Sequence, residues 1–381
     1  MDAKGEKKLL KVGSRKSKLA LIQTNHVIER LKDYYGDDKY EFEIITMNTT
    51  GDNILNTPLA EIGSKALFTK ELEEALLNNE IDFIVHSMKD MPTTLPRGCC
   101  IGAVLKREDP NDVLILKKSF NVEHQITSLT DLLKSSNNKN GSFTIGTSSY
   151  RRIAQLKYYN PGVQCINIRG NLTTRFQKLD DPDSNYTALM LAAAGVQRSG
   201  YEDRITETLD SDDWFYAVGQ GALAIECREE DRFILDLLTP IFHFKTCLEC
   251  ISERSLMKLL EGGCSVPIGV RCKWEFDGDE NPNDKHYSIR AKLWLSGAVF
   301  SLDGTKKVEH TDFVDLNEDV EESETNFTNI SLPSRTLPCF EKVKRQYRNS
   351  YKLGYMLSKS LREKGAVDIL NEIKQSKQKV L

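Results

Sequence analysis

Strand and helix patterns alternate along the N-terminal part of this chain. Apolar runs predict strands at residues 8–13, 41–47 and 81–86, and helical apolar spacing predicts helices at 17–35 and at 69–78, the latter with Thr69 as its N-cap. This order is typical of a parallel α/β sheet, because parallel strands need long crossover connections. Ligands of such sheets bind at the carboxyl ends of the strands. Arg15, Lys89 and Asp90 follow two of these predicted strand ends.

A second region with the same alternation, from about Asn121 to Ala217, contains a long stretch without acidic residues. No Asp or Glu occurs between Leu132 and Leu179, although the whole chain has 56 acidic residues against 52 Lys and Arg. A mildly acidic protein that excludes acids from such a stretch presents local positive potential there, which indicates an anionic ligand. A solvated basic surface is the alternative.

The arginines of this stretch follow two short predicted strands. In chain order come a strand at 143–146, a helix N-terminus at Thr147–Ser149, Arg151 and Arg152 in the first helical turn, a strand at 165–168, and then Arg169 and Arg175. A helix N-terminus offers free backbone N–H groups and the positive end of the helix dipole. Arginine adds a planar fork that makes two parallel hydrogen bonds to a carboxylate or phosphate. Their placement favours an anion site over a solvated surface.

Composition limits the class of protein. The 381 residues suffice for two or three domains, and no apolar run is long enough to span a membrane. Nine cysteines at irregular spacings are typical of reduced thiols, and the N-terminus resembles neither a signal nor a transit peptide, so we expect a cytoplasmic protein. The net charge of −4 argues against general nucleic-acid binding.

The C-terminal part has a different pattern. A helix is predicted at 246–260, strands at 266–274 and 287–295, a hairpin turn at Asp303-Gly304, a mobile acidic insertion at 316–329, and a last helix around Leu353–Leu361. The close-set glycines of 217–228 indicate a tight crossing of the backbone but match no phosphate-binding loop.

Four further residues or pairs carry reactive groups. Lys89-Asp90 is either an ion-binding and acid/base pair or a surface turn. Cys264 follows two glycines, which let a thiol approach a ligand, although most single cysteines are buried apolar residues. Cys247 and Cys250 have CxxC spacing, but no second pair completes a metal site, so we assign them to core packing and predict no metal. His86 ends a buried strand and is either structural or the base of a thiol hydrolase.

Nine segments together resemble the porphobilinogen deaminase (hydroxymethylbilane synthase) family. In chain order they are VGSRKSKLALIQ, TTGD, LFTKELEEALL, DFIVHSMKDMPT, GTSSYRRIAQL, IRGNLTTR, AAGVQRSG, AVGQGALAIECR and EGGCSVPIG, colinear from about Leu10 to Gly269. The arginine stretch and EGGCSVP are the most specific. The departures are conservative, with Met88, Met91 and Tyr150 where Leu is usual. Residues 301–338 look like the insertion of animal members.

The resemblance implies an enzyme that joins four porphobilinogen molecules into the linear tetrapyrrole 1-hydroxymethylbilane. It also implies a dipyrromethane cofactor attached through a thioether to Cys264, and Asp90 as the catalytic carboxylate that acts on pyrrole nitrogens, beside Lys89. Each pyrrole ring carries two carboxylates, which explains the many arginines. The positions that match cofactor contacts are Cys264, Lys89, Asp90, Thr147, Ser148, Ser149, Arg151, Arg152, Gly170 and Gln220. Those that match substrate contacts are Arg15, Ser17, Gln23, Phe68, Arg169, Arg175 and Arg198.

The resemblance also implies the architecture. Two α/β domains would resemble type II periplasmic binding proteins, and a small C-terminal α+β domain with an antiparallel sheet would carry the cofactor cysteine. The expected division is residues 1–117 with 219–240, residues 118–218, and residues 241–381 with an insertion at about 301–338. We expect a monomer whose partners are porphobilinogen and the growing chain, with no nucleic acid or membrane. A non-catalytic anion-binding module and a thiol hydrolase using His86 are the competing classes.

Overall fold

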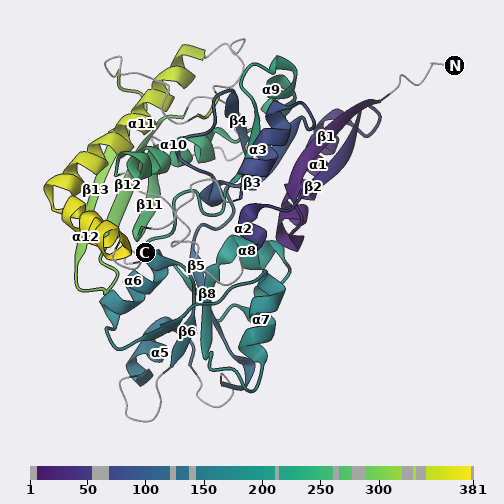
Figure 1. The fold of residues 1–381 in the computed structure, drawn as a ribbon. Coiled ribbons are helices and arrows are strands. Elements are labelled where there is room, and N and C mark those ends of the chain that lie inside the picture. Colours follow the sequence, from purple (N-terminus) through teal and green to yellow (C-terminus); the bar gives the residue numbers. More distant parts are fainter. Residues whose placement is uncertain are drawn as a thin grey trace.

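Three β-sheets organise the fold, and Figure 1 shows each in a lobe of its own. The structure is a computed structural model that describes residues 7–53, 68–120, 126–136, 143–210, 214–260, 266–276, 289–319, 329–331 and 340–378. No helix within those ranges is long and apolar enough to cross a membrane.

The first sheet has five strands in the order β2-β1-β3-β10-β4. Its strands are β1 (Lys8–Arg15), β2 (Tyr40–Met47), β3 (Phe83–Ser87), β4 (Cys99–Val104) and β10 (Leu223–Arg228). Around it lie α1 (Lys18–Tyr35), α2 (Thr50–Asn53), α3 (Lys70–Leu77), η2 (Met88–Asp90) and α9 (Arg232–Leu238). The predicted parallel pairing of β1 with β2 and β3 is confirmed. Thr69 is the N-cap residue of α3, as predicted, although its side chain makes no capping hydrogen bond.

The second sheet has the order β7-β6-β8-β5-β9. Its strands are β5 (Asp112–Leu116), β6 (Thr144–Gly146), β7 (Gln164–Ile166), β8 (Ala188–Ala192) and β9 (Glu207–Leu209). The helices are α5 (Leu129–Ser136), α6 (Tyr150–Tyr159), α7 (Leu172–Asp180), α8 (Ala193–Arg198) and η3 (Glu202–Arg204). In both sheets one antiparallel strand, β10 or β5, enters from the other half of the chain. The two sheets thus share the topology expected of type II periplasmic-binding-protein domains.

The chain crosses between these sheets twice, once between β4 and β5 and once between β9 and β10. The division into domains stays a prediction. However, β5 pairs along its whole length with β8, so a boundary that follows the sheets falls before Asp112 and not after residue 117. Pairing explains the difference, because the buried N–H and C=O groups of an apolar strand need partners wherever they lie.

The third sheet is antiparallel and consists of β11 (Ile268–Phe276), β12 (Ala291–Phe300) and β13 (Lys307–Asp315). It packs with α10 (Phe244–Leu259), α11 (Phe340–Glu363) and α12 (Ala366–Gln378), while η4 (Thr239–Ile241) precedes α10. The α/β fold class with a small antiparallel C-terminal sheet is confirmed. The hairpin at Asp303-Gly304 is also confirmed, with Gly304 at φ 77 between β12 and β13.

The predicted insertion is more ordered at its edges than the sequence indicates. Strand β13 falls inside the range 301–338 and belongs to the third sheet. Leu316 is fully buried, and Ile330 bridges Ile101 of β4 in parallel. The prediction of a mobile stretch over 316–329 is therefore wrong at both ends, because apolar side chains and backbone hydrogen bonds anchor them. Residues 320–328 lie outside the described residues.

Two glycines allow the second crossing to pass close to its neighbours, as the sequence predicts. Gly219 and Gly221 have φ values of 72 and 87, in the left-handed region. A Cβ on Gly221 would stand 2.4 Å from the carbonyl oxygen of Glu108, which belongs to the first crossing. The two crossing segments therefore touch through backbone atoms.

A buried carboxylate on α10 links the third lobe to both crossings. Glu253 is 0 % exposed, accepts hydrogen bonds from Arg107 at 2.6 and 3.0 Å, and accepts one from the backbone N–H of Gly219 at 2.7 Å. Arg107 lies on the first crossing and also donates from Nε to the carbonyl of Gln220 at 2.7 Å. Glu253 of α10 thus contacts both segments by which the chain passes between the two sheets.

Glu253→Gln is expected to lower the free energy of unfolding by about 3 kcal/mol, because the buried guanidinium of Arg107 loses its bidentate counter-charge and keeps only Glu249, at 3.2 Å. Chemical denaturation measures the loss. The control is Glu372→Gln, which removes the exposed ion pair with Lys306 and should leave the transition unchanged. Equal, small effects of both substitutions would contradict the structural role given to Glu253.

Candidate anion-binding site

Lys89 and Asp90 lie where β3 ends, on the short helix η2. Both side chains are partly buried. Burial lowers the pKa of Lys89 to about 8; the charge of Asp90 opposes this shift, and the nearby Arg152 adds to it. The strand end therefore presents an acid and a base beside the arginines of the second sheet, which supports the ion-binding interpretation over a surface turn.

The N-terminus of α6 supplies the central arginines. Ser149 is the N-cap and accepts from the backbone N–H of Arg152, so the sequence prediction of a helix N-terminus here is confirmed. Arg151 and Arg152 occupy the first turn and are only 4 % and 7 % exposed. Buried guanidinium groups need partners, because desolvating an ion without compensation is costly.

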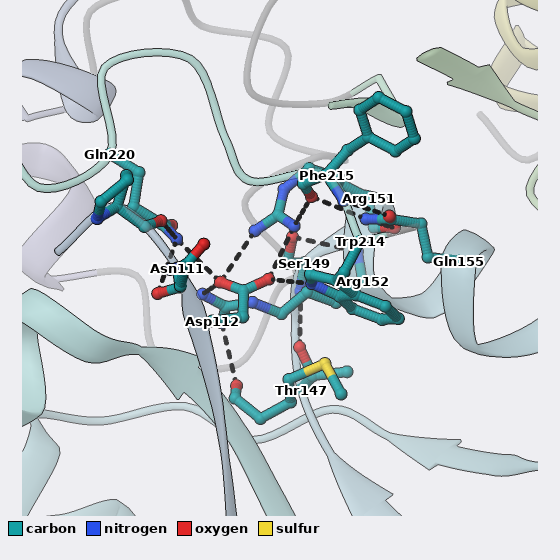
Figure 2. A network of polar contacts seen from close by, with 12 residues as sticks. Asn111, Asp112, Thr147, Ser149, Arg151, Arg152, Gln155, Trp214, Phe215 and Gln220 are labelled. Atoms are coloured by element: carbon teal, nitrogen blue, oxygen red, sulfur yellow. Dashed lines mark hydrogen bonds and ion pairs between the residues drawn. The ribbon is translucent and has the colours of Figure 1, made fainter. Parts of the chain in front are cut away.

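Those partners converge on Asp112, the first residue of β5, as Figure 2 shows. Arg151 donates to its two carboxylate oxygens at 2.7 and 3.2 Å, and Arg152 donates to Oδ1 at 2.8 Å. The indole Nε1 of Trp214 and the amide Nε2 of Gln220 donate to the same carboxylate at 2.9 and 2.8 Å. The paired cations hold the pKa of Asp112 far below its usual range, against the effect of its burial.

The two arginines of this cluster still have hydrogen-bond donors without a partner in the part of the chain that the structure describes. The Nε–H donors of Arg151 and Arg152 are buried and have no hydrogen-bond partner among the residues the structure describes. A buried donor without a partner is costly, which makes these Nε atoms candidates for contact with a ligand. Carboxylates fit these donors, because they accept hydrogen bonds and carry the opposite charge. The site therefore has the donor set for the acidic side chains of a dipyrromethane.

Arg169 and Arg175 extend the positive charge along the start of α7. Arg175 donates from Nε to the carbonyl of Gly170 at 3.0 Å. Burial, reinforced by the charges of Arg152 and Arg169, lowers its pKa to about 10, while Asp90 opposes that shift. Gly170 has φ 112, a conformation that a side chain would disfavour. The structure thus brings these arginines into one cluster with the end of β3.

Three residues of the first sheet's lobe lie around the end of β1. The guanidinium of Arg15 stacks on the ring of Phe68, with 4.2 Å between its Cζ and the ring centroid. Ser17 caps α1 by accepting from the N–H of Ala20, so its hydroxyl already has a structural partner. The guanidinium of Arg15 therefore covers one face of the Phe68 ring in this structure. A ligand ring could stack on that face only if Arg15 moved.

Gln23 and Arg198 lie apart from the central cluster, in a pocket of about 390 Å³ between α1 and α8 that Glu108 also lines. Arg198 donates to the carbonyl of Gly221 at 2.8 Å, and Gln23 donates to Ser87 at 2.9 Å. Burial lowers the pKa of Arg198, and the charge of Glu108 opposes this effect. This arginine is thus held against the second crossing rather than against Asp112.

The remaining polar positions support the backbone. Ser148 donates to the carbonyl of Ile168 at 2.6 Å, which ties the end of β6 to the loop before α7. Thr147 accepts from the N–H of Ser149 at 3.3 Å. Gln220 donates to the carbonyl of Pro110 at 2.7 Å and joins the two crossings. These contacts position the loops that carry the arginines.

Sequence reasoning missed Asp112, although two adjacent arginines in a buried helical turn imply a buried counter-charge. His86 hydrogen-bonds Glu226 at 2.9 Å in the interior of the first lobe, which fits the structural interpretation of this histidine. Cys247 and Cys250 are both 0 % exposed, so their assignment to core packing is confirmed. Cys264 lies outside the described residues.

Two similar α/β sheets joined by two crossing segments, with a cluster of cations near the end of β3 and the start of α6, are features suited to a protein that binds an anionic ligand. Residues 10–236 match the model of the porphobilinogen deaminase dipyrromethane cofactor binding domain, and residues 247–325 match that of the C-terminal domain. The chain belongs to the porphobilinogen deaminase family, and the resemblance noted in the sequence is confirmed.

Curated relatives agree. The chain is 40 % identical over 367 residues to the porphobilinogen deaminase of Nostoc sp., covering 96 % of this chain and 95 % of that protein. It is 48 % identical over 298 residues to that of Carboxydothermus hydrogenoformans, covering 78 % and 86 %. With that of Saccharomyces cerevisiae it shares 43 % over 304 residues, covering 79 % and 85 %.

Lys89 is expected to make ligand binding weaken above pH 8. Its depressed pKa of about 8 means that the ammonium loses its proton as pH rises through that value, and a neutral amine binds a carboxylate poorly. The KM for porphobilinogen should therefore rise above pH 8 in the unmodified chain. It should stay flatter in Lys89→Arg, which remains charged.

Stability should change in the opposite direction. The folded protein holds the Lys89 proton less tightly than the unfolded chain does. The free energy of unfolding should therefore rise as pH increases from about 8 to the ordinary lysine value of 10.5. A KM that does not change between pH 7 and pH 9, or that changes equally in Lys89→Arg, would remove Lys89 from carboxylate binding.

Proposed function

We propose that this chain is a hydroxymethylbilane synthase. It joins four porphobilinogen molecules head to tail, takes up one water and releases four ammonia molecules together with 1-hydroxymethylbilane. The observation that carries the proposal is the buried pair Arg151 and Arg152, which has Nε donors left for carboxylates and lies near the ammonium of Lys89, in a chain of the porphobilinogen deaminase family. A substrate with two carboxylates per ring needs such a cluster at the strand ends.

The family's dipyrromethane supplies the pyrrole end to which each new substrate unit is joined. Cys264 is the proposed attachment point, because a thiolate is a soft nucleophile and its two preceding glycines leave room for a ring. In this proposal Arg151 and Arg152 hold cofactor carboxylates, assisted by Lys89, Gly170 and Gln220 and by the hydroxyl groups of 147–149.

Asp90 is the proposed catalytic residue. A carboxylate that faces a pyrrole N–H stabilises positive charge on the ring as ammonia leaves, and it can move a proton between ring and leaving amine. Its place beside Lys89 and Arg175 keeps it close to the carboxylate-binding groups. The incoming ring then meets Arg15, Arg169, Arg175 and Arg198, with Ser17, Gln23 and Phe68 as further contacts.

The same proposal includes a cytoplasmic monomer with three domains and no nucleic-acid or membrane partner. The domains are residues 1–117 with 219–240, residues 118–218 and residues 241–381, with the first boundary moved before Asp112 if it follows the sheets.

Porphobilinogen turnover tests the function. The purified chain should release one ammonia per porphobilinogen consumed and form a linear tetrapyrrole identifiable by its mass. Porphobilinogen binding without ammonia release would indicate the non-catalytic binding module. Labelling of Cys264 by ordinary thiol reagents, with no pyrrole on the protein, would indicate the thiol hydrolase.

The arginines should divide by stage. Arg151→Gln is expected to give protein without cofactor, because each buried charged hydrogen bond contributes about 1.5–3 kcal/mol to holding it. Arg175→Gln and Arg15→Gln should load cofactor but accumulate protein with one or more substrate units attached. Intact mass after brief exposure to porphobilinogen separates these outcomes. Equal loss of cofactor in all three variants would contradict a division by stage.

A further inference from the structure

Asp112 is buried at a fixed place in the second sheet. It is 0 % exposed, and its backbone pairs with Ala192 on one side and Leu209 on the other. Its carboxylate accepts five hydrogen bonds, from Arg151, Arg152, Trp214 and Gln220. A carboxylate has about four lone-pair sites, so this group has no capacity left for a further partner. A ligand cannot use it directly, and the strand prevents it from moving aside.

The arginines are saturated on one side only. Arg151 donates hydrogen bonds to Asp112 and, at 2.6 Å, to the carbonyl of Phe215. Arg152 donates hydrogen bonds to Asp112 and, at 2.9 Å, to the carbonyl of Met190. Each guanidinium has five N–H donors in a rigid plane, so fixing its Nη atoms also fixes the direction of Nε. Both Nε donors are buried and unpaired among the described residues.

The balance of charges at the site also favours binding of a ligand carboxylate. Two guanidinium groups against one carboxylate leave a net positive charge, and the ammonium of Lys89 lies close enough to interact with all three. Asp112 therefore offsets part of the repulsion between adjacent buried cations but does not neutralise the site. A ligand carboxylate completes the balance.

We propose that Asp112 is a positioning residue, which fixes the guanidinium planes of Arg151 and Arg152 so that their Nε donors face ligand carboxylates. The proposal rests on the carboxylate-binding role given to the two arginines in the proposed function. It explains why a site for a polyanion contains a fully buried acid. Asp112 itself does not touch the ligand.

Two readouts test this role with the full-length chain. The first is the fraction of denatured protein that carries the mass of two extra pyrrole units. The second is the affinity for citrate, a simple tricarboxylate, measured by calorimetry on Cys264→Ala and independent of enzyme activity. The variants are Asp112→Asn, Asp112→Glu and the control Asp180→Asn, which removes a bidentate pair with Arg204 elsewhere in the same lobe.

Asp112→Asn is expected to reduce both cofactor loading and citrate affinity on the order of tenfold or more, as befits the loss of charge-assisted hydrogen bonds. Asp112→Glu should recover part of each, and Asp180→Asn should match the parent chain. Citrate affinity in Asp112→Asn equal to the parent, or a parent that does not bind citrate, would overturn the inference.

If Asp112→Asn does not fold, Asp112→Glu decides, because it keeps the charge and shifts the guanidinium planes by one methylene. Reduced citrate affinity in that folded variant supports a positioning role, and unchanged affinity refutes it. A parent chain without pyrrole mass that still binds citrate in an Asp112-dependent way would disprove the enzyme function but not the role of Asp112.

Discussion

Asp90→Ala is expected to lower kcat about a hundredfold or more while the protein stays folded and loaded with cofactor. Losing one preorganised group that stabilises charge in the transition state commonly has an effect of this size. Asp90 is partly exposed at the end of β3, so we expect its removal to destabilise the fold less than removal of the fully buried Asp112 would. Ammonia release measures kcat, and intact mass reports loading.

Asp90→Glu serves as the matched variant. It keeps the charge and moves it by one methylene, so its kcat should fall less than that of Asp90→Ala. An alanine variant with nearly normal kcat would remove Asp90 from the mechanism. A variant that lost its cofactor as well would instead make Asp90 a binding residue.

Cys264→Ala is expected to abolish turnover, because the proposed thioether cannot form without the sulfur atom. The denatured variant should have the mass of the bare chain. Cys165→Ala is the control, since that thiol is partly buried beside β6 and has no role in the proposed site. It should carry the same extra mass as the parent chain. Extra mass on Cys264→Ala would place the attachment on another residue.

Local patterns were sufficient to predict most elements of the fold. The alternation of apolar runs identified β1, β2 and β3 together with α1 and α3, because each burial pattern repeats with the period of its own element. The helix N-terminus at Ser149 was also predictable, since hydroxyl residues there precede a periodic segment.

Contacts between distant segments were not predictable in the same way. Asp112 pairs with arginines about forty residues further along the chain only because β5 crosses into the second sheet, and nothing local in DVLIL marks that crossing. Glu253 meets Arg107 across a separation of 146 residues for the same kind of reason. Local periodicity determines which face of an element is buried, but not which element covers it.

The acidic stretch after β13 illustrates a further limit. Its composition is typical of a disordered segment, yet the backbone of Ile101 accepts from Ser331 at 2.9 Å and donates to Asn329 at 2.7 Å. A strand edge can bind any segment that offers backbone groups in register, so composition alone does not exclude pairing.

The intact mass of the denatured wild-type chain, measured before and after brief exposure to porphobilinogen, tests the central claim most directly. The account predicts a chain heavier by two pyrrole units before exposure, and a series of heavier species, each larger by one further unit, after it. A chain with the bare mass that nevertheless turns over porphobilinogen would contradict the account, as would a loaded chain that never gains a unit.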